Sequence, residues 1–598
     1  MFYFDSRNSE YKTPLGSVPA YTQLSLTVSC TGENDVPVLL FAKDKEEPKV
    51  ITFTDAVVSQ DSRNYSYDVL LNDPGLYFYC FRLSDGRLLL DDGCGKNIIA
   101  DGGNWFSQSV FEQTFTTPDY FKGGIAYQIF PDRFNQAVTD RAPSFPDRKY
   151  VKNKADIPFH GEPDDPDGRY VTTDYFGGDL KGITEKLDYI KSFGVDCIYL
   201  NPIFLSHSNH RYNTRDYRQI DPDLGTLDDF RELCSRAHGK DIKIVLDGVF
   251  SHTGSDSIYF NMEKRYGEGG AYNDPESPYR SWFVFGDEYK NGYRAWWDFP
   301  TLPEINEMDP SYIEYICGDE GVISYWLENG ADGFRLDVAD ELPDEFIFRI
   351  RDAVKRYGND KLLIGEVWEN AVTKESYGYR RQYLLGKGLD GTMNYPFRTA
   401  ILSFMKTGNA YDFCESVLDV CDLYPRRSLN VMWNSLSTHD TERAVTNLAG
   451  YDCDRLSRPQ QAAIEIFGDE LELAKKKLAC ATALQFTLPG VPVIYYGDEI
   501  GMSGGKDPFN RAYFQWWNQD ERLQEEFRKI AGIRLSSDVY RDANIFFTNV
   551  DDRAVGFIRY LGDERMLTLV NISDREHTFC FENKRYTVAP LSWLIEKI

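Results

Sequence analysis

One pattern fills the middle of the sequence: short apolar segments alternate with longer segments of helical periodicity. Apolar strands that alternate with amphipathic helices are typical of parallel βαβ units. Eight such strands in succession predict an α/β fold in which a parallel sheet closes into a (β/α)8 or TIM barrel with insertions. The apolar segments begin at Ile125, Cys197, Ile242, Gly333, Leu362, Gly391, Asn430 and Pro492.

Several of the intervening segments carry their own start and stop signals. Lys181 to Phe193 is followed by Gly194, and Leu471 to Leu488 is stopped by Pro489 and Gly490. Thr226 and Asp229 form a capping pair that opens a helix ending at His238. These signals predict helices on the outside of the barrel.

Strand-like segments separated by turn residues flank the central region on both sides. They predict an N-terminal β-sandwich over residues 1–118 and a C-terminal β-sandwich over residues 539–598, which leaves residues 119–538 for the barrel. After the third strand, residues 251–310 are too aromatic and irregular for a crossover helix. We expect an inserted subdomain there.

The charge balance narrows the classes of partner. The 598 residues contain 66 Lys and Arg against 94 Asp and Glu, a net charge of −28 that repels phosphate backbones and anionic lipids. Nucleic acid and membrane surfaces are therefore not expected partners. The N-terminus has no basic or apolar signal region, and the 11 cysteines include no CxxC pair, so we expect a reducing, cytoplasmic location.

Four carboxylates stand at the carboxyl ends of predicted strands, where active sites of barrels are built. They are Asp247, Asp337, Glu366 and Asp440. A single acid at a strand end is usually a turn or cap residue. Four acids on adjacent and alternating strands, three of them beside an Arg or His, instead indicate one site.

Arg335 and Asp337 are two residues apart on one strand, so both side chains point to the same side of the sheet. The guanidinium favours the ionised form of Asp337, as a nucleophile needs, although a structural ion pair explains the pair alone equally well. Glu366 lies one strand over, and Val367 and Trp368 predict an apolar setting for it. Two carboxyl groups about 5–5.5 Å apart are what a retaining glycosidase requires.

Two of the seven histidines, His252 and His439, lie close to strand-end acids. Zinc is the alternative reading, but no HExxH motif or cysteine cluster accompanies them. Neutral donors to sugar hydroxyls fit better. Aromatic residues such as Tyr212, Trp296 and Trp297 crowd the same loops and suit the apolar faces of sugar rings, although each alone fits a core equally well.

Together these segments resemble the α-amylase family of glycoside hydrolases. DGVFSH (247–252), GFRLDVADE (333–341), GEVW (365–368) and STHDTE (437–442) resemble its four signatures in their usual order. The resemblance covers the chain from about residue 120 onward. YQIFPDRF (127–134), SNHRYNTRDY (208–217), LPEIN (302–306) and GVPVIYYGDEIGM (490–502) extend it.

The resemblance implies roles for individual residues. Asp337 is expected as the nucleophile, Glu366 as the general acid/base and Asp440 as a stabiliser of the transition state. The residues expected to bind substrate are Arg335, His252, His439, Asp247, Tyr212, His210, Trp368, Asp507 and Arg511. Asp507 and Arg511 match a pair that holds the non-reducing end, and Trp368 borders the acceptor side.

Within the family, the sequence is most similar to neopullulanases, cyclomaltodextrinases and maltogenic amylases. This implies cleavage of α-1,4 and some α-1,6 bonds in maltodextrins, cyclodextrins or pullulan through a covalent glycosyl-enzyme intermediate. An α-glucosidase, glucosyltransferase or sugar isomerase of the same family is the alternative, and a non-catalytic glucan-binding protein is a remote one. The partners expected are α-glucan oligosaccharides and a second copy of the chain, bound through the N-terminal domain.

The sequence departs from the family at residues that concern calcium. Ser251 replaces the usual Asn, a common calcium ligand, and Asp179 and Asn135 are the calcium ligands that remain. We expect no required cofactor and no requirement for calcium.

Overall fold

The computed structural model describes residues 1–32, 35–58, 62–139, 141–146, 148–158 and 172–598. The chain forms two compact units. The first comprises Met1–Thr117, Glu369–Gly391 and Cys414–Leu429, and the second comprises Pro118–Trp368, Thr392–Phe413 and Asn430–Ile598. The C-terminal strands therefore belong to the same unit as the barrel, and two later segments join the N-terminal residues.

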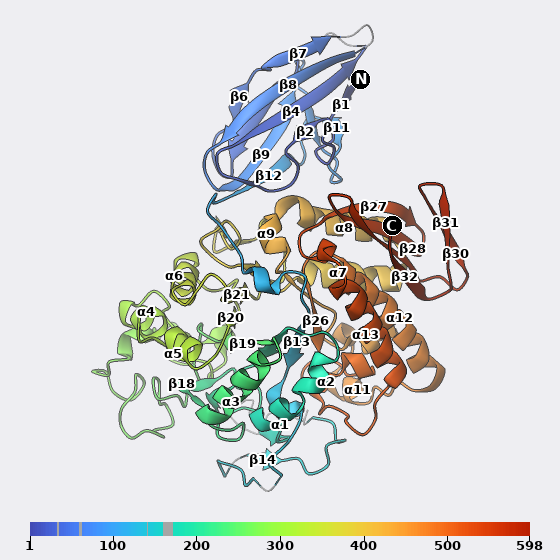
Figure 1. Cartoon of the computed structure of the whole chain (residues 1–598). Coiled ribbons are helices and arrows are strands. Elements are labelled where there is room, and N and C mark those ends of the chain that lie inside the picture. The colour runs from blue at the N-terminus through green and yellow to red at the C-terminus, as the bar shows by residue number, and fades with distance from the viewer. Residues whose placement is uncertain (33–34, 59–61, 140, 147, 159–171) are drawn as a thin grey trace. The chain divides into compact units, whose positions relative to one another are not determined.

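Eight parallel strands form the sheet at the centre of the barrel, in the order β24-β21-β20-β19-β16-β13-β26-β25. A parallel bridge between Met393 and Trp433 joins the two ends, so the predicted barrel is confirmed (Figure 1). Its strands are β13 (Ala126–Ile129), β16 (Cys197–Leu200), β19 (Lys243–Gly248), β20 (Gly333–Leu336), β21 (Leu362–Gly365), β24 (Gly391–Thr392), β25 (Trp433–Ser435) and β26 (Val491–Tyr495). Seven of them lie within the predicted apolar segments, and β26 begins one residue before the predicted start at Pro492.

The barrel strands are almost wholly buried, which explains why their sequences read as apolar runs rather than as alternating patterns. Tyr199, Val245, Ile364, Trp433 and Val493 come from five different strands and pack in one cluster. The interior of the barrel is thus a packed core, and chemistry is left to the strand ends.

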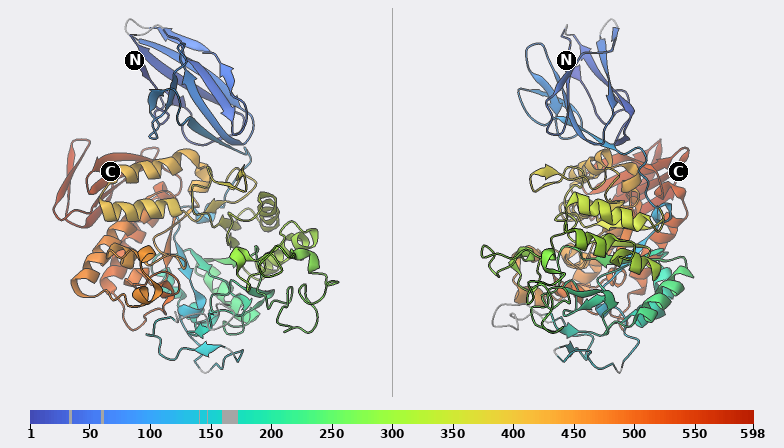
Figure 2. Two further views of the ribbon diagram at one scale, coloured as in Figure 1. Left: turned by 180° about the vertical axis from the view of Figure 1, so that it is seen from behind. Right: turned by 90° about the vertical axis from the view of Figure 1, so that its left-hand side faces the viewer.

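Helices connect most of the strands and lie outside them (Figures 1 and 2). They are α1 (Leu180–Glu185), α2 (Leu187–Lys191), α3 (Leu227–His238), α4 (Pro310–Cys317), α5 (Val322–Glu328), α6 (Asp344–Lys355), α7 (Tyr395–Thr407), α8 (Ala410–Leu423), α9 (Arg426–Leu429), α10 (Ala444–Leu448), α11 (Arg458–Ala462), α12 (Gly468–Thr487) and α13 (Glu521–Leu535).

The predicted helix signals are mostly confirmed. Thr226 and Asp229 form a reciprocal capping box at the start of α3, and α12 ends one residue before Leu488. The helix expected over Lys181–Phe193 is instead divided into α1 and α2 at Lys186, whose ψ of 6° is not helical. α12 packs against both α13 and the C-terminal strands, which explains why its last turns are buried all round.

Two connections depart from the βα repeat. Between β21 and β24 lies no helix but a short hairpin, β22 (Glu375–Ser376) and β23 (Tyr379–Arg380). After β19, residues 251–310 form an irregular segment held by isolated bridges such as His252 to Glu304 and Phe283 to Ile305. Isolated bridges and aromatic contacts, such as Phe260 with Phe283 and Tyr293, therefore hold the predicted inserted subdomain together.

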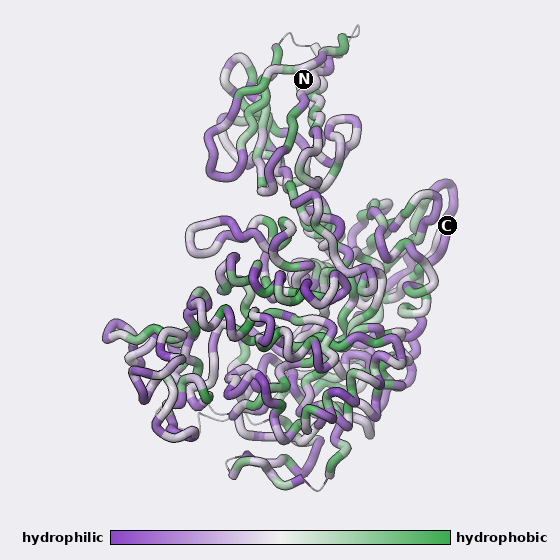
Figure 3. Tube along the Cα trace, turned by 60° about the vertical axis from the view of Figure 1, so that its left-hand side comes forward, coloured by the Kyte–Doolittle hydropathy of each residue, from purple (hydrophilic) through white to green (hydrophobic). Residues whose placement is uncertain are grey.

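The N-terminal part of the first unit consists of two antiparallel-rich sheets. One sheet contains β1 (Phe2–Tyr3), β2 (Lys12–Thr13), β4 (Thr22–Thr31), β7 (Asp55–Val58) and β8 (Ser62–Leu71). The other contains β3 (Val18–Pro19), β5 (Val38–Lys43), β6 (Lys49–Ile51), β9 (Gly75–Arg82), β10 (Leu88–Asp91), β11 (Asn97–Ala100) and β12 (Phe106–Phe111). Alternate residues of β4 are buried, and the tube in Figure 3 changes repeatedly between hydrophobic and hydrophilic colour in this part.

The C-terminal strands form a four-stranded sheet and a hairpin. They are β27 (Asn544–Asp551), β28 (Ala554–Leu561), β29 (Glu564–Asn571), β30 (His577–Phe581), β31 (Lys584–Val588) and β32 (Ser592–Lys597). Within the described ranges, none of the helices combines the length and the apolar character that crossing a bilayer requires.

Candidate active site

One buried arginine gathers the carboxylates of three neighbouring barrel strands. Arg335 Nη1 lies 2.8 Å from Asp247 Oδ1 and 2.8 Å from Asp337 Oδ1. Its Nη2 lies 2.8 Å from Glu366 Oε2, without the angle of a hydrogen bond. Because β19, β20 and β21 are adjacent and in parallel register, the predicted convergence of these acids follows from the sheet itself.

The pKa of Asp337 depends on burial and on several neighbouring charges as well as on Arg335. Burial raises the pKa of Asp337 well above its usual range, and Glu366, Asp247 and Asp440 raise it further, while Arg335 opposes them. Arg335 therefore favours the ionised form of Asp337, as expected, but it shares its guanidinium with Asp247 and Glu366. Because these acids lie within one another's electrostatic field, their protons are gained and lost as a group rather than one residue at a time.

Glu366 lies among hydrogen-bond donors. Its Oε2 accepts from the backbone N–H of Val338 at 3.0 Å, and its Oε1 accepts from the indole N–H of Trp368 at 3.1 Å. The predicted apolar setting is therefore wrong for the carboxylate oxygens. Trp368 turns its ring against Tyr395, stacked at 3.9 Å between centroids, and remains 42% exposed. It can therefore both orient Glu366 and meet a ligand.

Val338 has a backbone conformation that its side chain disfavours. Its φ is +42°, in the left-handed region, where a β-branched residue is strained. This conformation directs its N–H to Glu366. Strain of this kind persists only where the surroundings enforce it, often at functional sites. No signal in the sequence identifies it.

Asp440 faces this cluster from the loop after β25. Its Oδ2 lies 3.0 Å from His439 Nε2 and its Oδ1 3.4 Å from Arg511 Nη2. Burial and the charge of Glu366 raise the pKa of Asp440 to about 7, although Arg511 opposes them. Arg511 also contacts Asp507 at 2.9 Å, so Arg511 lies between Asp507 and Asp440.

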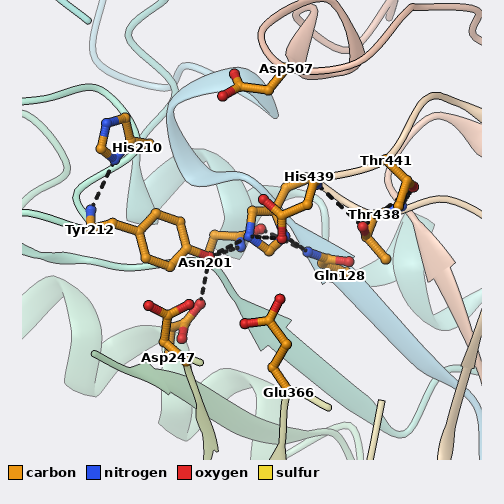
Figure 4. Close-up of polar contacts among 12 residues, drawn as sticks. Gln128, Asn201, His210, Tyr212, Asp247, Glu366, Thr438, His439, Thr441 and Asp507 are labelled. Carbon is orange, nitrogen blue, oxygen red and sulfur yellow. Dashed lines mark hydrogen bonds and ion pairs between the residues drawn. The ribbon is translucent and has the colours of Figure 1, made fainter. Parts of the chain in front are cut away.

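The stacked rings of Tyr212 and His439 lie between Asp247 and Asp440, and Figure 4 shows Tyr212, His439 and Asp247. Tyr199 and Tyr212 donate to Asp247 Oδ2 at 2.6 and 2.9 Å. The rings of Tyr212 and His439 stack at 5.4 Å, and the Tyr212 N–H donates to His210 Nδ1 at 3.1 Å. Tyr199 was not predicted as a site residue. It lies in the second predicted strand, β16, which pairs with β19, the strand that carries Asp247.

His252 is buried beside the inserted segment. Its ring stacks on Trp296 at 5.5 Å, its Nδ1 lies 2.9 Å from Ser251 Oγ, and its Nε2 has no hydrogen-bond partner among the described residues. Burial lowers the pKa of His252 to about 4, so the ring is neutral at ordinary pH. A neutral N–H donor suits a sugar hydroxyl.

The two candidate calcium ligands do not fit a cation site. Asp179 accepts from the N–H groups of Gly182 and Val138, as the N-cap of α1. The Asn135 side-chain amide donates to Gly182 O at 3.1 Å. Among the described residues, no group of acidic, histidine or cysteine side chains has the arrangement of a metal site. The expectation that calcium is not required stays a prediction.

Comparison with known proteins agrees with the resemblance found in the sequence. The family profile "Alpha amylase, catalytic domain" matches residues 128–557. An amylopullulanase from Thermoanaerobacterium thermosulfurigenes is 33% identical over 609 aligned residues, which cover 92% of this chain and 32% of that protein. Neopullulanase 2 from Thermoactinomyces vulgaris is 31% identical over 478 residues, with 78% of this chain and 72% of that protein covered.

Among solved structures, the ligand-free cyclic α-maltosyl-(1→6)-maltose hydrolase from Arthrobacter globiformis is 29% identical with a TM-score of 0.68. The match covers 81% of this chain and 100% of that chain. The chain spans about a third of the length of the amylopullulanase that it matches.

Proposed function

Because the chain belongs to the α-amylase family of glycoside hydrolases, we propose that it cleaves α-glucans with retention of anomeric configuration. The bonds are α-1,4 and some α-1,6 glucosidic links in maltodextrins, cyclodextrins or pullulan. The observation that carries the proposal is the arrangement around Arg335, where one buried guanidinium contacts Asp247, Asp337 and Glu366.

In the proposed mechanism, Asp337 attacks the anomeric carbon while Glu366 gives its proton to the departing glycosidic oxygen. A glycosyl ester of Asp337 forms and the first sugar leaves. Glu366 then removes a proton from water, the water oxygen bonds to the anomeric carbon, and Asp337 is released. Asp440 binds hydroxyls of the distorted sugar in both steps.

The remaining predicted residues bind and orient the substrate. Arg335 holds the carboxylates of Asp337 and Glu366 on one guanidinium, which favours a fixed geometry between them. Trp368 offers its exposed ring on the acceptor side. Arg511 and Asp507 suit the non-reducing end, because their paired charges supply donors and acceptors for hydroxyl groups.

A product time course tests the proposal. The purified protein is incubated with maltoheptaose, β-cyclodextrin and pullulan, the products are separated by chromatography, and the anomer released first is followed by proton NMR. We expect ring opening, panose from pullulan and the α-anomer. Products longer than the substrate favour a transferase, release of the β-anomer contradicts retention, and no product from any of the three contradicts the proposal.

We also propose a cytoplasmic location, which the sequence supports because its 11 cysteines include no CxxC pair. Cell fractionation tests it. The homodimer through residues 1–118 stays a prediction, and sedimentation of the intact chain against a variant without these residues tests it.

A further inference from the structure

Gln128, on β13, lies beside the active-site histidine and has no part in the chemistry proposed above. Its side chain is fully buried. The side-chain Nε2 lies 2.9 Å from His439 Nδ1 and 3.0 Å from Asn201 Oδ1 (Figure 4). Its Oε1 has no partner among the described residues. Both hydrogen bonds therefore come from the amide nitrogen, which has two protons to give.

The next link is the hydroxyl of Tyr212, which meets three groups at once. It lies 2.9 Å from Asp247 Oδ2, 3.0 Å from Asn201 Nδ2 and within hydrogen-bond distance of His439 Nε2. A phenol has one proton to donate and lone pairs to accept with. Asp247 already accepts from Tyr199 at Oδ2 and from Arg335 at Oδ1, so it accepts the phenol proton too. Asn201 and His439 must then both donate to the Tyr212 oxygen.

The opposite arrangement fails on proton count. If the amides of Gln128 and Asn201 were both rotated, Oε1 of Gln128 would accept a proton from Nδ1 of His439. Asn201 would then present its oxygen, and His439 its Nε2 lone pair, to Tyr212. Three acceptors would share one phenol proton, and the Nε2 lone pair would also face Asp440 Oδ2 at 3.0 Å.

We propose that Gln128 is a positioning residue that, together with Asn201, holds His439 in the tautomer that carries its proton on Nε2. In this tautomer the Nε2–H points to Tyr212 and Asp440, and Tyr212 is free to donate to Asp247. The effect on turnover rests on the proposed function, because Asp440 is its transition-state stabiliser.

The ring itself is neutral, so the tautomer decides which nitrogen donates. Burial lowers the pKa of His439 well below 6.5, and Arg335, Arg511 and His210 lower it further. A neutral imidazole donates from one nitrogen only, which its hydrogen-bond partners select. Gln128 is the described partner of Nδ1, on the side away from Asp440.

The test replaces Gln128 with Glu, which has the same shape but only accepts. Proteins with ¹⁵N-labelled histidine are studied by NMR, and the His439 signals are assigned by their loss in His439→Gln. We expect Nδ1 to be unprotonated in the wild type and protonated in Gln128→Glu. With maltoheptaose, we expect kcat to fall roughly ten- to a hundredfold, as when a partner that orients a functional histidine is lost, with KM changed less than about threefold.

Gln485→Met is the matched control, because Gln485 is another buried amide whose Nε2 donates twice, to Asn434 O and Val493 O. It should lose stability and keep both the His439 signals and kcat. Gln128→Met, which removes the donors without adding an acceptor, should show both tautomers if Gln128→Glu does not fold. The proposal is overturned if His439 keeps its Nε2 proton in both Gln128 variants, or if the tautomer changes and kcat does not. The NMR result needs no substrate, so it stands even if the wild type cleaves none of the three glucans.

Discussion

Two arginines in this chain each hold three carboxylates, and their surroundings differ. Arg335, in the barrel, is fully buried with Asp247, Asp337 and Glu366, and the acids come from three strand ends. Arg7, in the first unit, contacts Glu415, Asp419 and Asp422, which follow one another at helical spacing on α8.

The comparison shows that burial, and not the number of charges, separates a structural cluster from a chemical one. The acids around Arg7 range from 20% exposed for Glu415 to 60% for Asp419, so water solvates part of this cluster, although burial also raises the pKa of Asp419 and Asp422. Around Arg335 the side chains are at most 10% exposed, so burial raises the pKa of Asp337, the neighbouring carboxylates raise it further, and Arg335 lowers it. The proposed nucleophile attacks only when ionised, a form that Arg335 favours, whereas the acids on α8 tie two segments of the first unit together.

The sharpest division between the clusters should come from isosteric removal of single acids. Asp337→Asn and Glu366→Gln should each lower kcat by roughly a thousandfold or more, because each removes a chemical role and keeps the shape. Glu415→Gln makes the same kind of change beside Arg7 and should leave kcat within about twofold. Initial rates on maltoheptaose measure all three, with circular dichroism to check folding. Near-full activity in either barrel variant contradicts the assignment of roles.

The arginines themselves should differ in what their loss does to stability. Arg335→Met leaves buried carboxylates without a cation and should lower the free energy of unfolding by about 3–5 kcal/mol. Arg7→Met removes partly solvated pairs and should cost about 1 kcal/mol. Urea titrations of both variants provide the values. Equal losses would show that burial does not separate the two clusters.

The next test measures how stability changes with pH through Asp440, which faces the acids around Arg335. The pKa of Asp440 is raised to about 7, so the folded protein holds this proton at pH values where the unfolded chain has lost it. The stability that the proton contributes is present in full below about pH 4 and is lost as pH rises through 7. Because Asp440 is partly exposed, the loss should be on the order of 1 kcal/mol. Asp440→Asn should therefore equal the wild type at pH 4 and exceed it in urea resistance at pH 8. A variant that is less stable at pH 8 would mean that Asp440 is stabilised as an anion.

The fold and the acids of the site could be predicted from the sequence because both follow simple periods. Eight apolar runs define the barrel, and parallel register brings Asp247, Asp337 and Glu366 to one edge. The two-residue period places Arg335 on the same side as Asp337.

What could not be predicted depends on distances across the barrel. Gln128 and His439 are more than 300 residues apart in sequence, and neither the network through Asn201 nor the donors around Glu366 has a local signal. The positive φ of Val338 is likewise imposed by its surroundings, since its residue type argues against it. The net charge of Asp337 needed the other carboxylates in place.

The smallest effect should come from Lys12, near Arg7. Its side chain is buried and lines a cavity of about 110 Å³ together with Asp91 and Asp422, and its ammonium lies 6.0 Å from the centroid of the Tyr79 ring. Burial lowers the pKa of Lys12 to about 8, so the folded state loses the proton before the unfolded chain does. Stability should therefore rise with pH between about 8 and 10.5.

Lys12→Met removes this buried charge and keeps the length of the side chain, so it should stabilise the protein by on the order of 1 kcal/mol at pH 7. The gain should shrink as pH rises toward 10, because the wild-type amine then becomes neutral as well. Lys49→Met, at an exposed position of β6, should change stability by less than about 0.5 kcal/mol at either pH. If Lys12→Met stabilises the protein and keeps kcat, the charges near Arg7 tolerate the loss of one member. The charges around Arg335 are not expected to tolerate such a loss. A loss of stability at pH 7 would instead mean that the carboxylates around the cavity hold the ammonium more tightly than water does.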